Sequence, residues 1–398
     1  MALDFQQLHN QIRQMGAQAV DEARQLEARR AAAEAALQRY ADDLAYLHAR
    51  VEQARALSPA LRCAAPARES LTTHAAPPPA PHSGVLIAAD GSQINPDRHK
   101  AVDYYLLNLG AIALQLGSGS APTRHVQTLL YYGEALYRAD KTLISEEEVA
   151  RQRDLLERQM LVELVEQYLP AAGAPPLVLT LTDGPLELWG SKAGERGGDG
   201  DFRRSLALYI ESLEVLCRLG AATAGYVDKP RADLLVRLLE VAQLPAADLN
   251  EAGLRTRPFF GVTDADLLRT RLAPGERSAV FRLQSQSFRD YTGALTLHFF
   301  YINVGRAEKP WLARVEIPQW VAESRQALEA LHAVLLEQAR MLGEAAYPYL
   351  LHRAHEVAVV SHDEQAQATQ MIVLELRRRG LNDLEDSHKQ HAKDVSKR

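Results

Sequence analysis

Cysteine is nearly absent from this chain, and the scarcity excludes two classes of site. Of 398 residues, only Cys63 and Cys217 are cysteines, and they lie far apart without a partner motif. A structural zinc site needs clustered ligands, and a disulfide framework needs several cysteines at close spacing. We therefore expect neither, and a reducing cytoplasm is the expected compartment.

The chain also lacks the apolar segments that direct proteins to membranes. Its start, Met1 to Phe5, is not a basic stretch followed by an apolar core, so no signal peptide is expected. The most apolar run, Tyr104 to Leu116, is interrupted by Asn108 and Gln115 and is too short to span a bilayer. The prediction is a soluble, cytoplasmic protein without membrane association.

Two further absences bear on function. No G-x-x-x-x-G-K-[ST] motif occurs, so any step driven by ATP hydrolysis must come from a separate protein. The net charge of −6 excludes a uniformly basic surface for nucleic acid, although a local basic channel remains compatible with it. The hydrophobic content of 47% is enough for a sizeable core.

The two ends of the chain differ from its middle. Residues 1–60 carry a heptad-like apolar seam from 4 to 57, which predicts a long helix or helical hairpin, either packed on its own domain or pairing as a coiled coil. Residues 61–83 are rich in Pro and Ala and predict a semi-rigid linker. Residues 379–398 are charged and predict a disordered tail.

The segment 84–378 reads as a single α/β domain. Its first half predicts three strands, a helix at 145–168 capped by Ser145, a strand ending at Asp183, a helix at 202–219 and a strand at 222–227. This order, β-β-β-α-β-α-β, is that of the ribonuclease H-like fold, a mixed sheet flanked by helices. A later hairpin is expected over 295–317, followed by helices at 321–342 and 363–379.

Two wholly apolar strands end in the same pair, Asp90-Gly91 and Asp183-Gly184. Open α/β sheets place their chemistry at the carboxyl ends of strands, and two adjacent carboxylates are costly unless a cation lies between them. Either pair by itself is also a common turn. Their matched positions favour a divalent-metal site.

A third carboxylate is expected from the helix at 145–168. Glu157 and Glu163 both lie among apolar residues there, and a glutamate that faced the sheet would be costly to bury without a metal. Most glutamates on such a helix face solvent. The sequence favours Glu157 and leaves Glu163 open.

Several short motifs follow one another along the chain, namely Asp90-Gly-Ser, Arg153-x-x-x-Glu157-x-x-x-Leu161, Thr182-Asp183-Gly-Pro-Leu, Gly225-Tyr-Val-Asp-Lys229-Pro-Arg231, Phe300-Tyr-Ile-Asn, and Tyr347-Pro-Tyr followed by Ala354-His355. Taken together and in this order, they resemble the NurA nuclease family over about residues 84–375. The resemblance implies a manganese-dependent nuclease, with Mg²⁺ as an alternative ion. It further implies cleavage of single- and double-stranded DNA, resection of 5′ ends, and a hexameric HerA-type ATPase as partner in DNA end processing and repair.

The resemblance also implies roles for single residues. Asp90, Glu157 and Asp183 would be the metal carboxylates, and His355 a late-helix ligand or general base. His352 and His362 are nearby competitors, and a lone histidine is more often structural. Lys229 and Arg231 would contact DNA phosphates, or else lie on a solvated turn. A homodimer is expected as well, formed through the seam of residues 4–57 and the apolar hairpin at 295–317.

Two other functions share this fold. One is a non-catalytic adaptor that binds DNA or a motor, which would have no reason to keep both strand aspartates. The other is an actin-like phosphotransferase, but the Gly-rich segment 190–200 has no clear frame for cradling a phosphate. A metal-dependent DNA nuclease remains the leading prediction.

Overall fold

The computed structural model describes residues 3–97, 100–138, 140–169, 177–189 and 198–381. The predicted Gly-rich loop and the charged tail lie almost wholly outside these residues. The chain forms two compact units. The first comprises residues 1–79 and 227–332, and the second comprises residues 80–226 and 333–398. Each is described by itself.

The second unit is built on five strands in the order β7-β6-β3-β4-β5. β3 pairs antiparallel with β4 and parallel with β6, and β6 pairs parallel with β7. This is the predicted order of three antiparallel strands followed by two crossovers, so the ribonuclease H-like class is confirmed. The strands are β3 (Gly84–Ile94), β4 (Tyr105–Leu116), β5 (Thr123–Tyr131), β6 (Val178–Asp183) and β7 (Ala222–Val227).

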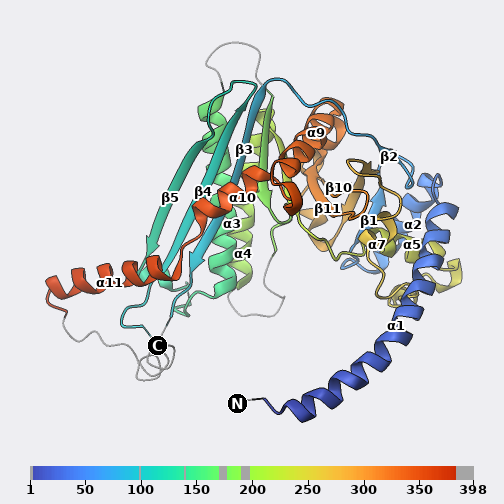
Figure 1. Ribbon diagram of the computed structural model, residues 1–398, viewed down its shortest axis with the longest axis horizontal. Coiled ribbons are helices and arrows are strands. Elements are labelled where there is room, and N and C mark those ends of the chain that lie inside the picture. Colours follow the sequence, from blue (N-terminus) through green and yellow to red (C-terminus); the bar gives the residue numbers. More distant parts are fainter. Residues whose placement is uncertain (1–2, 98–99, 139, 170–176, 190–197, 382–398) are drawn as a thin grey trace. The chain divides into compact units, whose positions relative to one another are not determined.

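Helices cover both faces of this sheet (Figure 1). The side of β3 that carries Gly91 meets α3, and the side of β4 that carries Gly110 meets α10, as the close approach of each helix to these glycines shows. Gly91 pairs with Leu109, which is the neighbour of Gly110 on β4. Since paired residues share a face and neighbouring residues of a strand point to opposite faces, α3 and α10 lie on opposite sides of the sheet. The helices are α3 (Glu146–Tyr168), α4 (Gly198–Arg218), α10 (Tyr349–Ala358) and α11 (His362–Arg378).

Helix α3 begins where the sequence predicts. The Ser145 side chain accepts from the Glu148 backbone N–H, and the Glu148 carboxylate accepts from the Ser145 N–H, which completes a capping box. The helix presents Leu161, Leu164 and Val165 to the core. Its phase therefore decides which of its glutamates are buried.

The first unit contains the strand order β1-β9-β10-β11, with β2 and β8 paired beside β10. Its strands are β1 (Cys63–Pro66), β2 (His74–Ala75), β8 (Arg277–Ser278), β9 (Phe281–Gln284), β10 (Leu297–Asn303) and β11 (Leu312–Pro318). Its helices are α1 (Phe5–Arg39), α2 (Leu44–Leu57), α5 (Leu234–Gln243), α6 (Glu251–Leu254), α7 (Asp264–Leu268) and α8 (Gln319–Glu323). The next helix, α9 (Arg325–Met341), begins in the first unit and ends in the second.

Three expectations need correction in this unit. The segment 61–83, predicted as a linker, contains β1 and β2, because Cys63, Ala64 and Ala65 pair with β9 and are buried. The hairpin of β10 and β11 forms as expected, but all of its strand residues are buried, so it is not an exposed association surface. The helix predicted over 321–342 is divided at Ser324 into α8 and α9.

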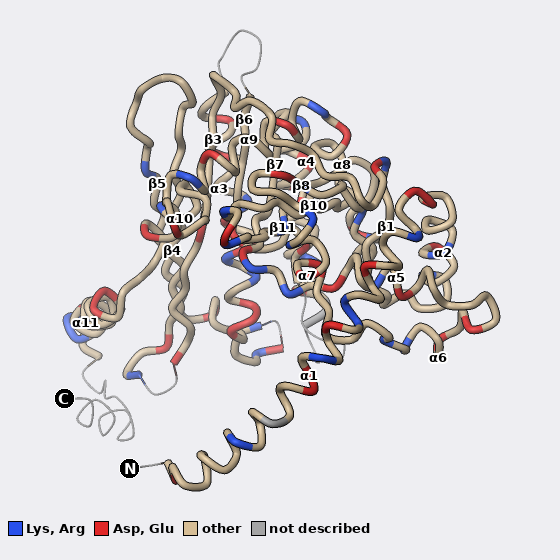
Figure 2. The backbone as a smooth tube through the Cα atoms, turned by 45° about the vertical axis from the view of Figure 1, so that its right-hand side comes forward, with Lys and Arg blue, Asp and Glu red and all other residues tan. Residues whose placement is uncertain are grey.

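The amino-terminal segment forms two helices, and its apolar seam is only partly covered. Near its end α1 buries Ala33, Ala36 and Leu37, whereas Ile12 and Met15 are 49% and 64% exposed. Charged residues are sparse along the first turns of this helix (Figure 2). In the described part of the chain no helix is long and apolar enough to cross a membrane.

Candidate functional site

Two aspartates lie side by side on β3 and β6. Asp183 is the last residue of β6, as predicted, but β3 does not end at Asp90, because its next residues, up to Ile94, continue to pair with β4. The two strands pair in parallel from Val85 opposite Val178 to Ala89 opposite Thr182, and Asp90 and Asp183 are the next residues on each strand. Adjacent strands are about 4.8 Å apart, so the register brings these carboxylates to neighbouring positions. Asp183 is exposed, whereas the side chain of Asp90 is only 16% exposed.

His355 reaches Asp90 from α10. Its Nδ1 lies 2.8 Å from Asp90 Oδ2, while the Gly91 backbone N–H donates to Asp90 Oδ1 at 2.8 Å. Because the carboxylate only accepts, Nδ1 carries the proton, and the neutral ring then has an acceptor at Nε2. Of the other candidate histidines, His352 pairs with Glu356 at 3.4 Å, and His362 begins α11.

Glu157 is the buried glutamate of α3. Only 8% of its side chain is exposed, whereas Glu163, two turns further along, is exposed to solvent. A Cβ atom at Gly91 would lie 2.6 Å from Arg153 Cγ and 2.8 Å from Glu157 Oε1, so any larger residue there would displace these two side chains. The helix phase therefore places Glu157, and not Glu163, beside the residue that follows Asp90.

The electrostatic environment of Glu157 is unfavourable to a bare carboxylate. Burial raises the pKa of Glu157 well above its usual value, and the negative charges of Asp154 and Asp90 raise it further. Arg153 and Arg158 act in the opposite direction, with Arg153 Nε 3.3 Å from Glu157 Oε1. A bound cation would relieve the same cost.

Tyr347 is a member of this group to which the sequence assigned no role. Its hydroxyl donates to the Asp183 carboxylate, and burial together with the charges of Asp183 and Asp90 raises the pKa of Tyr347. The ring packs edge-on against Tyr226, with centroids 5.5 Å apart. The motif Tyr347-Pro-Tyr was visible in the sequence, but its contact with the tip of β6 depends on the fold.

Arg158 joins α3 to the tip of β6. It is 2% exposed and donates from Nη2 to Thr182 Oγ1 at 2.9 Å and to the Tyr209 hydroxyl at 3.1 Å. Thr182 directly precedes Asp183. The guanidinium therefore fixes the backbone from which that carboxylate projects.

The carboxyl end of α10 is fixed to the sheet by polar side chains. The Ala358 carbonyl accepts from Ser92 Oγ of β3 and from Asn108 Nδ2 of β4, the latter at 2.8 Å. At Gly110 a Cβ atom would lie 2.8 Å from the Ala354 carbonyl oxygen, so only glycine permits this approach. These contacts set the position of His355, one turn before the end of the helix.

A cavity of about 620 Å³ borders His355. Arg124 of β5 and Arg353 of α10 line it, together with Tyr349, and Glu356 pairs with Arg353. Two guanidinium groups next to an exposed imidazole suit a phosphate-bearing ligand.

Lys229 and Arg231 lie in the first unit, on the turn that follows β7. Both are exposed, and the Lys229 ammonium lies 5.8 Å from the centroid of the Trp311 ring.

A metal site is not preformed among these side chains. Across the described residues, no three Asp, Glu, His or Cys side chains converge as ligands of one ion. The reason is local pairing, since Asp90 is bonded to His355, Asp183 to Tyr347 and Glu157 to Arg153. The donor set nevertheless fits Mn²⁺ or Mg²⁺, which prefer carboxylate oxygens, and such a cation would offset the repulsion between Glu157 and Asp90.

Comparisons with known proteins bear on the whole arrangement. The sequence model of the NurA domain matches residues 84–360, which is more than half of the chain. Among curated proteins, none matches this chain by sequence.

Solved structures show weaker likeness. The crystal structure of Drosophila Piwi aligns with a TM-score of 0.30 and 10% identity, over 70% of this chain and 30% of that one. LC9-RNase H1, a type 1 RNase H with the type 2 active-site motif, aligns with a TM-score of 0.22 and 14% identity, over 37% of this chain and 64% of that one. The chain thus spans less than two thirds of either protein, and likeness of this degree assigns no function.

Proposed function

The chain belongs to the NurA family, a family of nucleases, and from this premise we propose that it is a divalent-metal-dependent DNA nuclease whose reaction is organised by Asp90, Glu157, Asp183 and His355. The observation that carries the proposal is the neighbouring position of Asp90 and Asp183 on two adjacent parallel strands, with Glu157 buried next to them. Three carboxylates concentrated at one edge of a sheet are costly for a purely structural protein.

Asp90, Glu157 and Asp183 would hold the cation, with Mn²⁺ as the favoured ion and Mg²⁺ as an alternative. A divalent cation bound there would polarise a phosphoryl oxygen and lower the pKa of a water molecule. The chain's own groups have separate tasks. His355 keeps Asp90 oriented through Nδ1 and offers Nε2 to a proton, and Tyr347 keeps Asp183 oriented by donating to it.

DNA would approach this edge along the cavity beside His355. Arg124 and Arg353 would bind phosphates of the strand next to the scissile bond. Lys229 and Arg231, which belong to the first unit, would also bind phosphates of the DNA. These local positive groups offset the net charge of −6, which by itself disfavours a polyanionic substrate.

The finer parts of the proposal concern the biological setting. The protein would resect 5′ ends, with exonuclease and endonuclease activity on single- and double-stranded DNA, in cytoplasmic DNA repair. Since the sequence has no G-x-x-x-x-G-K-[ST] motif for binding a nucleoside triphosphate, a hexameric HerA-type ATPase would drive translocation along the DNA. A homodimer would form through the exposed seam of α1, where Phe5 is 59% exposed.

The test is cleavage of end-labelled DNA by the purified chain with Mn²⁺, with Mg²⁺ and with EDTA. Asp90→Asn and Asp183→Asn should each lower the rate about 100-fold or more, because a metal carboxylate contributes several kcal/mol to the transition state. Wild-type rates in both variants would exclude this site. DNA binding without cleavage under any metal would instead support the non-catalytic adaptor.

A further inference from the structure

A groove in the first unit is lined by cationic side chains and aromatic rings. Its volume is about 510 Å³, and its walls come from the turn after β7, the loop before α7 and the start of β11. The residues that matter to the argument are Lys229, Arg231, Arg269, Phe260 and Trp311. We call it the Phe260 groove.

The positive charge of the groove is largely available to a ligand. Arg231 and Arg269 are exposed, and neither pairs with a carboxylate within the described part of the chain. The acidic residues at its wall are already engaged. Asp233 pairs with Arg257, and Asp266 accepts from the Thr263 backbone N–H at the start of α7. The uncompensated guanidinium groups give the groove affinity for anions.

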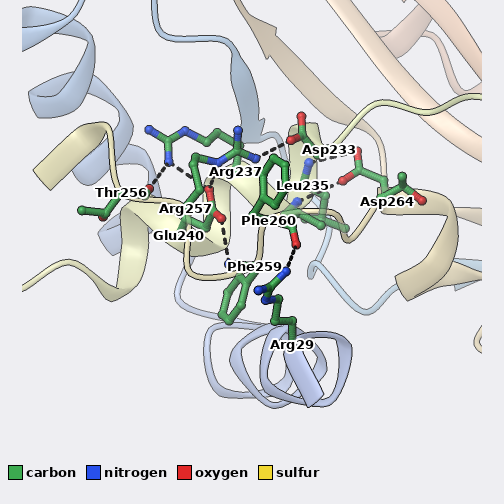
Figure 3. Close-up of polar contacts among 12 residues, drawn as sticks. Arg29, Asp233, Leu235, Arg237, Glu240, Thr256, Arg257, Phe259, Phe260 and Asp264 are labelled. Carbon is green, nitrogen blue, oxygen red and sulfur yellow. Dashed lines mark hydrogen bonds and ion pairs between the residues drawn. The ribbon is translucent and has the colours of Figure 1, made fainter. Parts of the chain in front are cut away.

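Phe260 is an exposed aromatic ring on a backbone that is held from two sides (Figure 3). Its carbonyl accepts from Arg29 of α1 at 3.0 Å, and the neighbouring Phe259 N–H donates to Glu240 at 3.0 Å. Glu240 also accepts from Arg237 at 2.9 Å and from Arg257 at 2.7 Å. The loop is thus ordered by a buried network while the Phe260 ring stays 64% exposed.

Trp311 and Lys229, on the opposite wall of the groove, are also held by contacts with their neighbours. The Trp311 indole N–H donates to Asp228 Oδ1 at 2.7 Å, and the Lys229 ammonium lies 5.8 Å from the Trp311 ring centroid. Lys229 has φ of +44° directly before Pro230, a conformation that is costly for a residue with a side chain. Strain of this kind persists where the surroundings enforce it, and it often marks a binding site.

We propose that the Phe260 groove binds a segment of single-stranded DNA, with an unpaired base stacked on Phe260 and adjacent phosphates bound by Arg231 and Arg269. This inference rests on the proposed nuclease function and names where the chain holds an unpaired substrate strand. Stacking on an aromatic ring beside cationic side chains is the general means by which proteins bind single strands without reading their sequence. A duplex keeps its bases stacked internally and cannot use the Phe260 ring in this way.

The experiment measures binding of the full chain to fluorescent oligothymidylate and to a duplex of equal length, in EDTA so that no cleavage occurs. Phe260→Ala should weaken single-strand binding by about 5- to 100-fold and duplex binding by less than about 2-fold. Phe260→Trp should retain single-strand binding. Arg269→Ala should weaken binding of both DNAs and reduce the slope of log K against log salt by about 1.

Matched controls separate the groove from general effects. Tyr132→Ala removes another ring that is 69% exposed, and Arg325→Ala removes another exposed guanidinium, 89% exposed. Both should bind as the wild type does. Wild-type binding by Phe260→Ala and Arg269→Ala, with unchanged melting temperatures, would overturn the proposal, as would displacement of the oligonucleotide by polyglutamate at equal charge concentration.

Failure of this inference can be told from failure of the proposed function. If the wild type cleaves DNA with Mn²⁺ but the groove variants bind normally, only the Phe260 groove is excluded. If the wild type cleaves under no condition, the nuclease proposal is excluded, and the binding comparison still decides the groove.

Discussion

His355 Nδ1 lies 2.8 Å from Asp90 Oδ2, although 265 residues separate the two in the sequence. The bond joins a helix near the end of the chain to the first strand of the sheet. It fixes the tautomer of the ring and leaves Nε2 as the nitrogen that can accept a proton. It therefore couples the orientation of the carboxylate to the protonation of the imidazole.

Replacement of His355 by alanine should slow DNA cleavage by about 100-fold or more, because it removes a proton acceptor and frees Asp90 to rotate. Manganese affinity should change less, since the carboxylates remain. Single-turnover cleavage and a Mn²⁺ titration measure the two effects. His352→Ala, which removes a ring on the same helix that pairs with Glu356, should cleave normally. An unchanged rate for His355→Ala would return this histidine to a structural role.

The Glu157→Gln variant should cleave DNA about 100-fold more slowly than the wild type, because only Glu157 is buried beside Asp90. The Glu163→Gln variant should cleave at the wild-type rate. The glutamine at position 157 should not lower thermal stability. Burial and the neighbouring charges raise the pKa of Glu157, so its ionised form costs free energy in the fold. Cleavage rates and melting temperatures of both variants decide the matter, and a reversed ranking of the two rates would contradict the assignment.

Arg124→Ala should weaken DNA binding in EDTA, because Arg124 lines the cavity beside His355. If it contacts one phosphate, the slope of log K against log salt should fall by about 1. Arg377→Ala removes an exposed guanidinium from α11, which does not border that cavity, and serves as the control. Equal salt slopes for the two variants would place the DNA elsewhere.

Asp264 should make the stability of the protein depend on pH. Burial raises its pKa to about 6, although the backbone N–H groups of Leu235 and Val236 and the Tyr301 hydroxyl donate to it. As pH rises from about 4 to about 6, the unfolded carboxyl releases its proton first. The free energy of unfolding should then fall with rising pH, by up to about 3 kcal/mol, and this contribution is lost above pH 6.

Urea denaturation between pH 4 and pH 7 measures that slope. Asp264→Asn should remove the Asp264 contribution, because the amide does not titrate in this range, while adding a constant cost from an imperfectly matched hydrogen bond. Asp248→Asn, an exposed carboxyl in the same unit, should keep the wild-type slope. A wild-type slope in Asp264→Asn would show that another group is responsible.

Local patterns in the sequence were sufficient for the sheet of the second unit. Apolar runs ending in Asp-Gly predicted β3 and β6, and Ser145 with Glu148 predicted the start of α3, because strand burial and helix capping depend on neighbouring residues. The same pattern placed Asp183 at the end of β6, but the predicted end of β3 at Asp90 was wrong, because the strand continues to Ile94 through its pairing with β4. The parallel register of the two strands then made the two aspartates neighbours.

Only the tertiary structure decided which partners complete the cluster. The choice of Glu157 over Glu163 depends on the phase of α3 against Gly91, and the choice of His355 over His352 depends on how α10 is fixed to β4 at Gly110. The Tyr347 hydroxyl donates to Asp183, which is distant in the sequence. The strands within 61–83 likewise form by pairing with distant parts of the chain. Such contacts follow from the packing of whole elements, which no local pattern encodes, whereas the end of β6 at Asp183 and the helix cap at Ser145 were determined by neighbouring residues in the sequence itself.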